Sequence, residues 1–259
     1  MRALRLIRLA RRQRRRRRLG QPARRRIVLH IGAHKTGTTY IQHMLEANRA
    51  TLPLAFEVVP RRLKELQALT VMTADPRDAA QAARLAPALQ ATAARLAERF
   101  ARVENLLITH EGLPGPLPGR QALPGLYPFA QLLLPPLIAG LESGGAEVSL
   151  VLYTRAFRDW QASLYRYRFR DRPGRRYAPR RFAERTGLPD GWDELLARLE
   201  TALAPGSLRV VSYEQDRAGG LLGRALYRHW GLSEAEIATL RRLPPQNVSR
   251  PETRHDRDF

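Results

Sequence analysis

A lysine, three threonines and two glycines lie within eight residues, 32–39, near the start of the chain. The apolar residues 27–29 before them are typical of a buried strand, and Ile41, Met44 and Leu45 after them recur at helical spacing. The order of strand, glycine-containing loop and helix directs several backbone N–H groups and the positive end of the helix dipole at one point. We therefore expect the loop to bind an anion, with Lys35 as a compact positive charge beside it.

The nucleotide P-loop is the first motif with which this loop can be compared. A Walker loop reads GxxxxGK[ST], so its lysine follows the second glycine. Here Gly37 is followed by Thr38, and Lys35 precedes that glycine by two residues. The sequence also shows no clear apolar strand that ends in an aspartate suited to magnesium. The loop therefore disfavours a magnesium nucleoside-triphosphate kinase, which remains an alternative, and we expect no metal ion.

The sequence Lys-Thr-Gly-Thr-Thr at 35–39 resembles instead the 5′-phosphosulfate loop of the sulfotransferases that use 3′-phosphoadenosine 5′-phosphosulfate (PAPS). The resemblance covers residues 27–249 by element order and includes an Asn-x-Ser tail seen in bacterial members. It implies a single α/β domain, in which a P-loop-like central parallel sheet carries helices on both faces. It also implies PAPS as co-substrate and transfer of a sulfuryl group to a hydroxyl or amine. The loop residues expected to bind PAPS are Lys35, Thr36, Gly37, Thr38 and Thr39, and Lys35 is also expected to act in catalysis.

A second set of candidate residues follows the apolar strand predicted at 148–154. The strand ends at Arg155, and Ser163 lies eight residues further on, in a predicted helix. An arginine at a strand end and a hydroxyl in the next helix can converge on one phosphate. In the family that the loop resembles, this spacing holds the 3′-phosphate of PAPS. The resemblance therefore implies that Arg155 and Ser163 bind the 3′-phosphate.

Sulfuryl transfer to a hydroxyl also needs a base, and two residues are candidates. The apolar strand predicted at 106–109 ends in His110 and Glu111, and chemistry in open parallel sheets gathers at the carboxyl ends of strands. Glu111 is therefore the first candidate and His34, within the loop, is the second. Strand alternation favours a structural role for His30 and His110. The sequence does not decide between Glu111 and His34.

The chain has 259 residues, of which 44% are apolar, and this is enough to bury a core. It contains no cysteine, so disulfides and thiolate metal sites are excluded. The net charge is +21, and thirteen of the arginines lie within residues 1–26, which hold no acidic residue. Only two lysines occur, Lys35 and Lys64. We expect a basic, disordered arm at 1–26, the α/β domain at 27–250 and a polar tail at 251–259.

The basic arm has no unbroken apolar run of the length found in a signal peptide or a membrane span. It is interpreted as disordered or, next, as a basic amphipathic helix on an anionic membrane surface. Because an arginine run attracts phosphate without reading sequence, we expect no specific nucleic-acid partner.

A non-catalytic protein that binds nucleic acid or membrane through this arm is the second alternative function. We expect a cytoplasmic protein, with peripheral association at the inner membrane surface through the arm as an option. A carbohydrate acceptor is preferred by the resemblance alone.

The remaining elements are expected to support this site. Apolar spacing predicts helices within 60–102, with a kink or break at Pro87, and a helix at 127–141 interrupted at Pro135 and Pro136. A strand at 207–213 ends in Tyr213 and Glu214, for which we expect a structural role. Helices are also predicted at 192–203, 221–230 and 234–243. Residues 171–189 are expected to form a long, mobile loop over the site.

Overall fold

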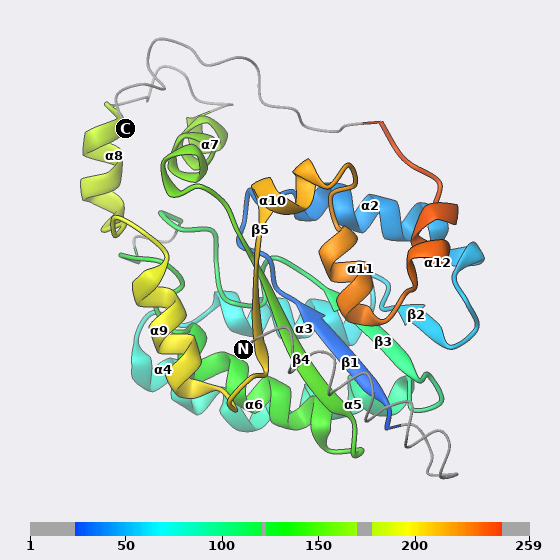
Figure 1. Ribbon diagram of the computed structural model, residues 1–259. Coiled ribbons are helices and arrows are strands. Elements are labelled where there is room, and N and C mark those ends of the chain that lie inside the picture. The colour runs from blue at the N-terminus through cyan, green and yellow to red at the C-terminus, as the bar shows by residue number, and fades with distance from the viewer. Residues whose placement is uncertain (1–23, 121–122, 170–177, 245–259) are drawn as a thin grey trace.

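The computed structural model describes residues 24–120, 123–169 and 178–244. Its centre is one sheet in the strand order β2-β3-β1-β4-β5, and every neighbouring pair is parallel. The predicted α/β class, with a central parallel sheet covered on both faces, is confirmed. Figure 1 shows the strands running side by side between two groups of helices. The strands are β1 (Arg26–His30), β2 (Phe56–Val58), β3 (Asn105–Thr109), β4 (Glu147–Thr154) and β5 (Leu208–Ser212).

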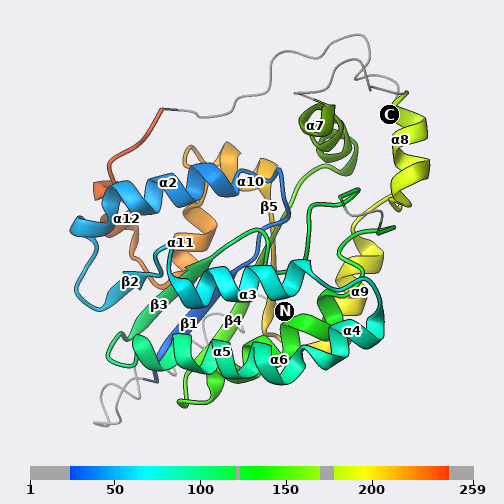
Figure 2. The ribbon, with the colours of Figure 1, turned by 180° about the vertical axis from the view of Figure 1, so that it is seen from behind.

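Two hydrophobic cores lie on opposite faces of the sheet, because successive side chains of a strand point to opposite sides. Ile27 and Leu29 of β1 belong to one core and Val28 belongs to the other. The first core is covered mainly by α3, α5, α6 and α9, and the second by α2, α11 and α12, as the views from both sides show (Figures 1 and 2). The helices are α2 (Thr38–Asn48), α3 (Lys64–Ala74), α4 (Ala79–Arg84), α5 (Ala86–Arg99), α6 (Ala130–Glu142), α7 (Phe157–Phe169), α8 (Pro179–Thr186), α9 (Asp193–Ala202), α10 (Tyr213–Ala218), α11 (Arg224–Trp230) and α12 (Glu234–Thr239), with a short 3-10 turn, η1 (Arg49–Thr51).

The prediction of a break at Pro87 is confirmed, whereas the predicted interruption of the next helix is wrong. Helix α4 ends before Pro87, which lies in the first turn of α5, where no N–H is needed. Pro135 and Pro136, in contrast, lie inside the continuous helix α6. The helix persists because the leucines around the prolines are buried and α6 packs closely on α5. A Cβ atom on Gly140 would lie only 2.2 Å from the Gln90 carbonyl oxygen, so glycine permits this approach.

Three short elements were not predicted. Strand β2 has three residues and pairs only with β3, at the edge of the sheet, so it is too short to show a periodic pattern. Helix α10 follows β5 directly, where a strand end was expected at Tyr213. The expected loop at 171–189 contains helix α8, whose Phe182 is buried against Tyr165 of α7, with ring centroids 5.6 Å apart. Residues 171–177 of this expected mobile loop lie outside the described ranges.

The fold begins slightly earlier than the predicted boundary at residue 27. Arg26 is the first residue of β1, and its guanidinium donates to the His229 carbonyl oxygen at 2.9 Å. The guanidinium of Arg25 donates to the carbonyl oxygens of Ala97 and Val103 at 2.8 and 3.2 Å. These bonds attach both arginines to the domain, although the arginine-rich composition of residues 1–26 predicted a disordered arm. Residues 1–23 and 245–259, which include most of the predicted arm and all of the predicted tail, lie outside the described ranges.

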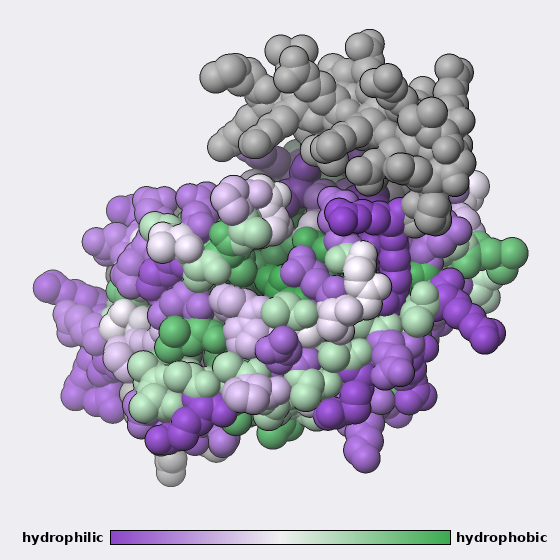
Figure 3. Space-filling model, turned by 90° about the horizontal axis from the view of Figure 1, so that it is seen from below, coloured by the Kyte–Doolittle hydropathy of each residue, from purple (hydrophilic) through white to green (hydrophobic). Residues whose placement is uncertain are grey.

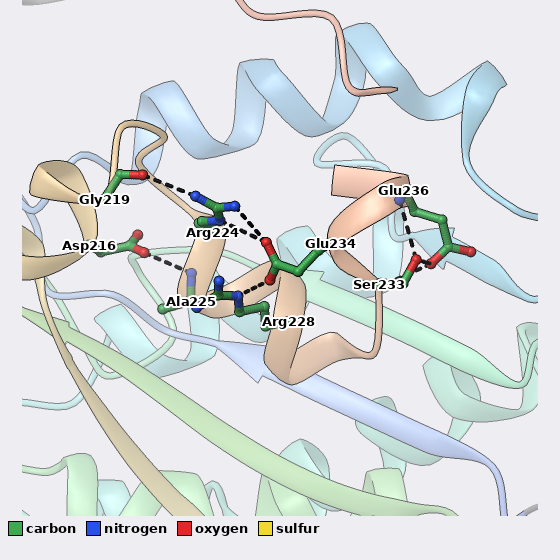
Figure 4. Close-up of polar contacts among 8 residues, drawn as sticks. All are labelled: Asp216, Gly219, Arg224, Ala225, Arg228, Ser233, Glu234 and Glu236. Carbon is green, nitrogen blue, oxygen red and sulfur yellow. Dashed lines mark hydrogen bonds and ion pairs between the residues drawn. The ribbon is translucent and has the colours of Figure 1, made fainter. Parts of the chain in front are cut away.

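Helices α10, α11 and α12 are joined by polar contacts beside the second core (Figure 4). The carboxylate of Asp216, in α10, accepts from the backbone N–H of Ala225 at 2.7 Å and so stabilises the start of α11. Glu234, the first residue of α12, pairs with Arg224 and Arg228 of α11. These contacts hold the C-terminal helices against the face that also carries α2.

Within the described ranges, no helix combines the length and the apolar character that crossing a membrane requires. The surface seen from below is a mixture of hydrophilic and apolar residues, with hydrophilic ones prominent at the margins (Figure 3). In Figure 1, β1, β3 and β4 point away from this lower surface, towards the opposite edge of the sheet. The candidate residues gather at that edge.

Candidate active site

Three neighbouring strands end at one edge of the sheet and bring the predicted residues together. The loop after β1, Glu111 after β3 and Arg155 after β4 all follow the carboxyl ends of these strands. The chain leaves β1 towards β2 and leaves β4 towards β5, so the two connections diverge between β1 and β4. Open parallel sheets bind ligands at such a switch point. The loop and Arg155 therefore flank the place where a ligand is expected.

The loop after β1 has a defined and partly strained shape. Its first part extends the sheet, because the Ala33 N–H donates to the Tyr153 carbonyl oxygen at 3.1 Å. Lys35 has a φ angle of 70° and Gly37 one of 82°, both in the left-handed region. A Cβ atom on Gly37 would lie 2.6 Å from Leu222 Cδ2. Both the φ angle and the close approach of Leu222 therefore require glycine at position 37.

The three threonines of the loop occupy different environments. Thr36 is fully buried, and its hydroxyl and backbone N–H both donate to the Ala33 carbonyl oxygen, at 2.5 and 3.2 Å. Thr38 is 4% exposed and begins α2, and Thr39 is half-buried beside it. The N-cap residue, Gly37, has no side chain to cap the helix, and the first N–H groups of any helix have no intrahelical partner. The start of α2 thus presents hydrogen-bond donors, while Thr36 shapes the loop from within.

Helix α7 contacts the loop from the side of β4. The Trp160 indole N–H donates to the His34 carbonyl oxygen at 2.7 Å, and Lys35 Nζ lies 4.3 Å from the centroid of the Tyr167 ring. Ser163 lies between these two residues on the same helix face, because residues three or four positions apart are neighbours on a helix. Its exposure is 7%. The predicted phosphate ligand Ser163 is therefore on the face of α7 that meets the loop.

The guanidinium of Arg155 lies between an aromatic ring and a carboxylate. Its Cζ is 5.3 Å from the centroid of the Tyr213 ring, and its Nε is 3.9 Å from Glu214 Oε1, too far for a hydrogen bond. The side chain is 19% exposed, and its buried Nε has no hydrogen-bond partner among the described residues. The backbone is held separately, because the Trp192 indole N–H donates to the Arg155 carbonyl oxygen at 2.7 Å. Arg155 thus has a fixed backbone and a partly exposed guanidinium.

His34 contacts Tyr127 through both its backbone and its ring. Among the described contacts, the Tyr127 hydroxyl meets the backbone nitrogen and Nδ1 of His34, both at 2.9 Å. The backbone N–H can only donate, so we assign the hydroxyl proton to Nδ1 and the proton of the neutral ring to Nε2. Burial lowers the pKa of His34 to about 4, against the opposing effect of the nearby Glu111. At neutral pH, His34 is therefore uncharged, and in this tautomer its Nε2 is a donor.

Glu111 is a charged group anchored to two other elements. Its Oε2 accepts from Gln42 Nε2, on α2, at 2.8 Å, and its Oε1 lies 3.8 Å from an Arg61 nitrogen. Burial acts to raise the pKa of Glu111, but hydrogen bonds from its own backbone N–H and from Gln42, together with His110 and His34, lower it overall. The side chain is 20% exposed. Glu111 is thus an accessible carboxylate at neutral pH.

Two further histidines near the strand ends are occupied within the fold. His30 is fully buried, its Nδ1 shares a hydrogen bond of 2.8 Å with the Thr109 hydroxyl, and burial lowers its pKa to about 4. His110 Nδ1 accepts from the Gly112 backbone N–H at 3.0 Å and so supports the turn after β3. In the described part of the chain, no three His, Asp or Glu side chains form a group that could hold a metal ion.

Several residues of the site were not predicted from the sequence to belong to it. Tyr127 and Trp160 contact the loop, and Tyr213 contacts Arg155. Tyr127 was predicted to begin a helix, and Tyr213 was expected to have a structural role. The sequence did contain a pattern that could have identified Gln42. It falls among the apolar residues that α2 buries, and a polar residue in such a stripe often has a specific partner.

Comparisons with known proteins give few matches. No protein-family model matches the chain, and no curated protein matches it. Among solved structures, the crystal structure of a sulfotransferase from Alicyclobacillus acidocaldarius is similar, with 13% sequence identity and a TM-score of 0.42. The alignment covers 88% of this chain and 87% of that chain.

Proposed function

We propose that this protein is a sulfotransferase that moves a sulfuryl group from PAPS to a hydroxyl or amine of an acceptor. One observation carries the proposal. The Lys-Thr-Gly-Thr-Thr loop, 35–39, lies at the switch point of the sheet, with Arg155 at the end of the adjacent strand. The loop supplies positive charge and helix N–H groups, and Arg155 supplies a second cationic site. PAPS has two separate phosphate positions and therefore requires both.

Each donor-binding residue has a distinct part in this proposal. Lys35, the N–H groups at the start of α2 and the hydroxyls of Thr38 and Thr39 would bind the 5′-phosphosulfate. They would stabilise the charge that develops on the departing phosphate, without a metal ion. Arg155 and Ser163 would bind the 3′-phosphate. Thr36 and Gly37 would maintain the loop shape that aligns these donors.

The reaction balances with groups that the site contains. The acceptor oxygen or nitrogen attacks sulfur, a new bond to sulfur forms, and the bond between sulfur and the phosphate oxygen breaks. The electron pair of the broken bond remains on adenosine 3′,5′-bisphosphate, and the acceptor proton passes to a base. We assign that base to Glu111, whose partly exposed carboxylate lies at the end of β3 and is ionised at neutral pH. His34 would donate from Nε2 to an oxygen of the transferring group.

The acceptor and the membrane association of the protein are further parts of this proposal. A carbohydrate hydroxyl is preferred by the family resemblance, and a lipid or small-molecule hydroxyl is the next choice. Membrane association would depend on residues 1–26. A magnesium nucleoside-triphosphate kinase would need magnesium ligands and a lysine after the loop glycine, and Gly37 is followed by Thr38.

The test is calorimetric titration of the full-length protein with adenosine 3′,5′-bisphosphate and, separately, with magnesium ATP. We expect tight binding of the bisphosphate without any metal. Lys35→Ala and Arg155→Ala should each weaken it by about 10- to 100-fold, because each removes a charge-assisted contact worth about 1.5–3 kcal/mol.

The chain offers a matched control for each substitution. Lys64 is the only other lysine and begins α3, and Arg158 is an exposed arginine three residues after Arg155. Lys64→Ala and Arg158→Ala should leave the affinity within about twofold. Absence of bisphosphate binding, or clear preference for magnesium ATP, would refute the sulfotransferase proposal.

A further inference from the structure

Gln42 is a buried amide that joins the loop helix to the end of β3. It lies in α2, four residues after Thr38, and is 3% exposed. Its Nε2 donates to Glu111 Oε2 at 2.8 Å, across 69 residues of sequence. The contact therefore links the helix that begins at the proposed donor site to the carboxylate proposed as base.

The other end of the same amide is unsatisfied. Gln42 Oε1 is buried and has no hydrogen-bond partner among the described residues. Turning the amide over would place its oxygen against a carboxylate and would lose the bond to Glu111. The unpaired oxygen carries a desolvation cost, which offsets part of the stability that the bond to Glu111 contributes. Stability alone therefore does not account for glutamine at this position.

The geometry around Glu111 shows what the amide contributes. Oε2 is bound by Gln42, whereas Oε1 has Arg61 at 3.8 Å, beyond hydrogen-bond distance, so Oε1 remains able to accept a proton. The other titratable groups near this carboxylate include His110 and His34, both with lowered pKa values, and also His30 and Tyr127. Glu111 is also more exposed than Gln42, so a ligand can reach the carboxylate and not the amide.

We propose that Gln42 is a positioning residue, which holds Glu111 by Oε2 and leaves Oε1 directed at the group that accepts the sulfuryl moiety. The inference rests on the proposed function, since a base is needed here only if transfer occurs here. The acceptor proton passes to Oε1, and the protonated Glu111 then releases it to solvent. Gln42 itself touches neither donor nor acceptor.

Gln42→Met tests this role, because methionine has the same length and no hydrogen-bond donor. In the full-length protein with ¹³C-labelled glutamate, the Glu111 carboxyl signal is assigned by its loss in Glu111→Gln and then titrated. We expect the pKa of Glu111 to rise in Gln42→Met, because a hydrogen bond to the charged carboxylate is lost. An unchanged pKa would overturn the positioning role.

Asn48→Leu is the matched control, since Asn48 is a buried amide at the other end of the same helix. It bonds to Arg241 through both its nitrogen and its oxygen, at 3.0 and 2.6 Å. We expect its loss to lower the unfolding midpoint and to leave the titration of Glu111 unchanged. An equal change of the Glu111 pKa in this control would also refute a specific role for Gln42.

A kinetic readout separates positioning from donor binding. Slow hydrolysis of PAPS, with water as acceptor, is followed by release of adenosine 3′,5′-bisphosphate across pH. Gln42→Met should lower this rate by about tenfold or more and move its acidic limb to higher pH. The bisphosphate affinity should stay within about twofold. Weaker bisphosphate binding would instead assign Gln42 to the donor site and overturn the inference.

Failure of the inference and failure of the proposed function give different results. If the wild-type protein does not bind the bisphosphate, the proposed function is wrong and the base role of Glu111 is wrong with it. If the bisphosphate binds and both the titration and the hydrolysis are unaffected by Gln42→Met, only the positioning role is wrong.

Discussion

Lys35 and Tyr127 are the two residues other than glycine that have positive φ angles in the described part of the chain, 70° and 45°. Both belong to the candidate site, because Tyr127 binds His34 and Lys35 is its neighbour in the loop. Such backbone conformations cost about 1–3 kcal/mol each and persist only where surrounding contacts enforce them. The strain at this site therefore agrees with a loop shaped for binding rather than for stability.

Gly37→Ala should damage the loop through two separate effects. Alanine is strained at a φ angle of 82°, and its Cβ would meet Leu222 Cδ2 at 2.6 Å and Tyr213 Cε2 at 3.0 Å. Gly220 has the same φ angle, and a Cβ atom there meets nothing within 4 Å. We expect Gly220→Ala to cost about 1 kcal/mol and Gly37→Ala about 2–4 kcal/mol in urea unfolding. Only Gly37→Ala should weaken bisphosphate binding. Equal costs would contradict the proposed contact with Leu222 and Tyr213.

At the scale of elements, two tryptophans connect the two halves of the donor site. The indole of Trp160 binds the carbonyl oxygen of His34, in the loop, and that of Trp192 binds the carbonyl oxygen of Arg155. The two rings pack edge to face with centroids 4.9 Å apart. Helix α7 and the start of α9 therefore hold the loop and the end of β4 at a constant separation. The proposed co-substrate PAPS requires this separation, because it has two phosphate groups to bind.

Trp160→Phe should weaken bisphosphate binding while the fold is retained. The substitution keeps an aromatic ring and removes the N–H that anchors His34. Trp230 is an equally buried control, whose indole N–H donates to the Asn105 carbonyl oxygen at 3.1 Å. Both variants should lose about 1–3 kcal/mol of stability. Calorimetry should show a loss of affinity of about fivefold or more for Trp160→Phe and none for Trp230→Phe. Similar affinities in the two variants would refute the anchoring role.

At the scale of the whole molecule, one buried and two half-buried histidines make folding sensitive to acid. Burial lowers the pKa of His30, His34 and His229 to about 4 each. In the unfolded chain a histidine titrates at about 6.5, so between these two values the unfolded state binds more protons. The stability that depends on neutral histidines is therefore fully present above about pH 6.5 and is lost as the pH falls towards 4.

Urea unfolding at pH 7, 6 and 5 measures this dependence. The free energy of unfolding should fall as the pH is lowered, with a slope that approaches about 1.4 kcal/mol per pH unit for each histidine. His229→Asn should have a shallower slope than the wild type, because one of the three groups is removed. A flat profile between pH 7 and 5 would show that these histidines are not held neutral in the folded state.

Much of the fold was predictable from the sequence, because it depends on interactions between residues close in the chain. The apolar runs of β1, β3 and β4, the break at Pro87 and the glycine at position 37 all report local conformation. The predictions failed where distant contacts decide the outcome. Pairing with β3 stabilises the three residues of β2, and packing on α5 keeps α6 helical through Pro135 and Pro136.

The sequence by itself determined the strand, loop and helix around residues 35–39, because glycine, apolar spacing and helix start are local properties. It also identified Arg155, Ser163 and Glu111 as residues at or after strand ends. Only the tertiary structure decided the strand order that places them at one switch point. It alone showed the contacts of Gln42 with Glu111, because these form between segments far apart in sequence. Such contacts depend on how the helices pack against the sheet, and a local pattern carries no record of that packing.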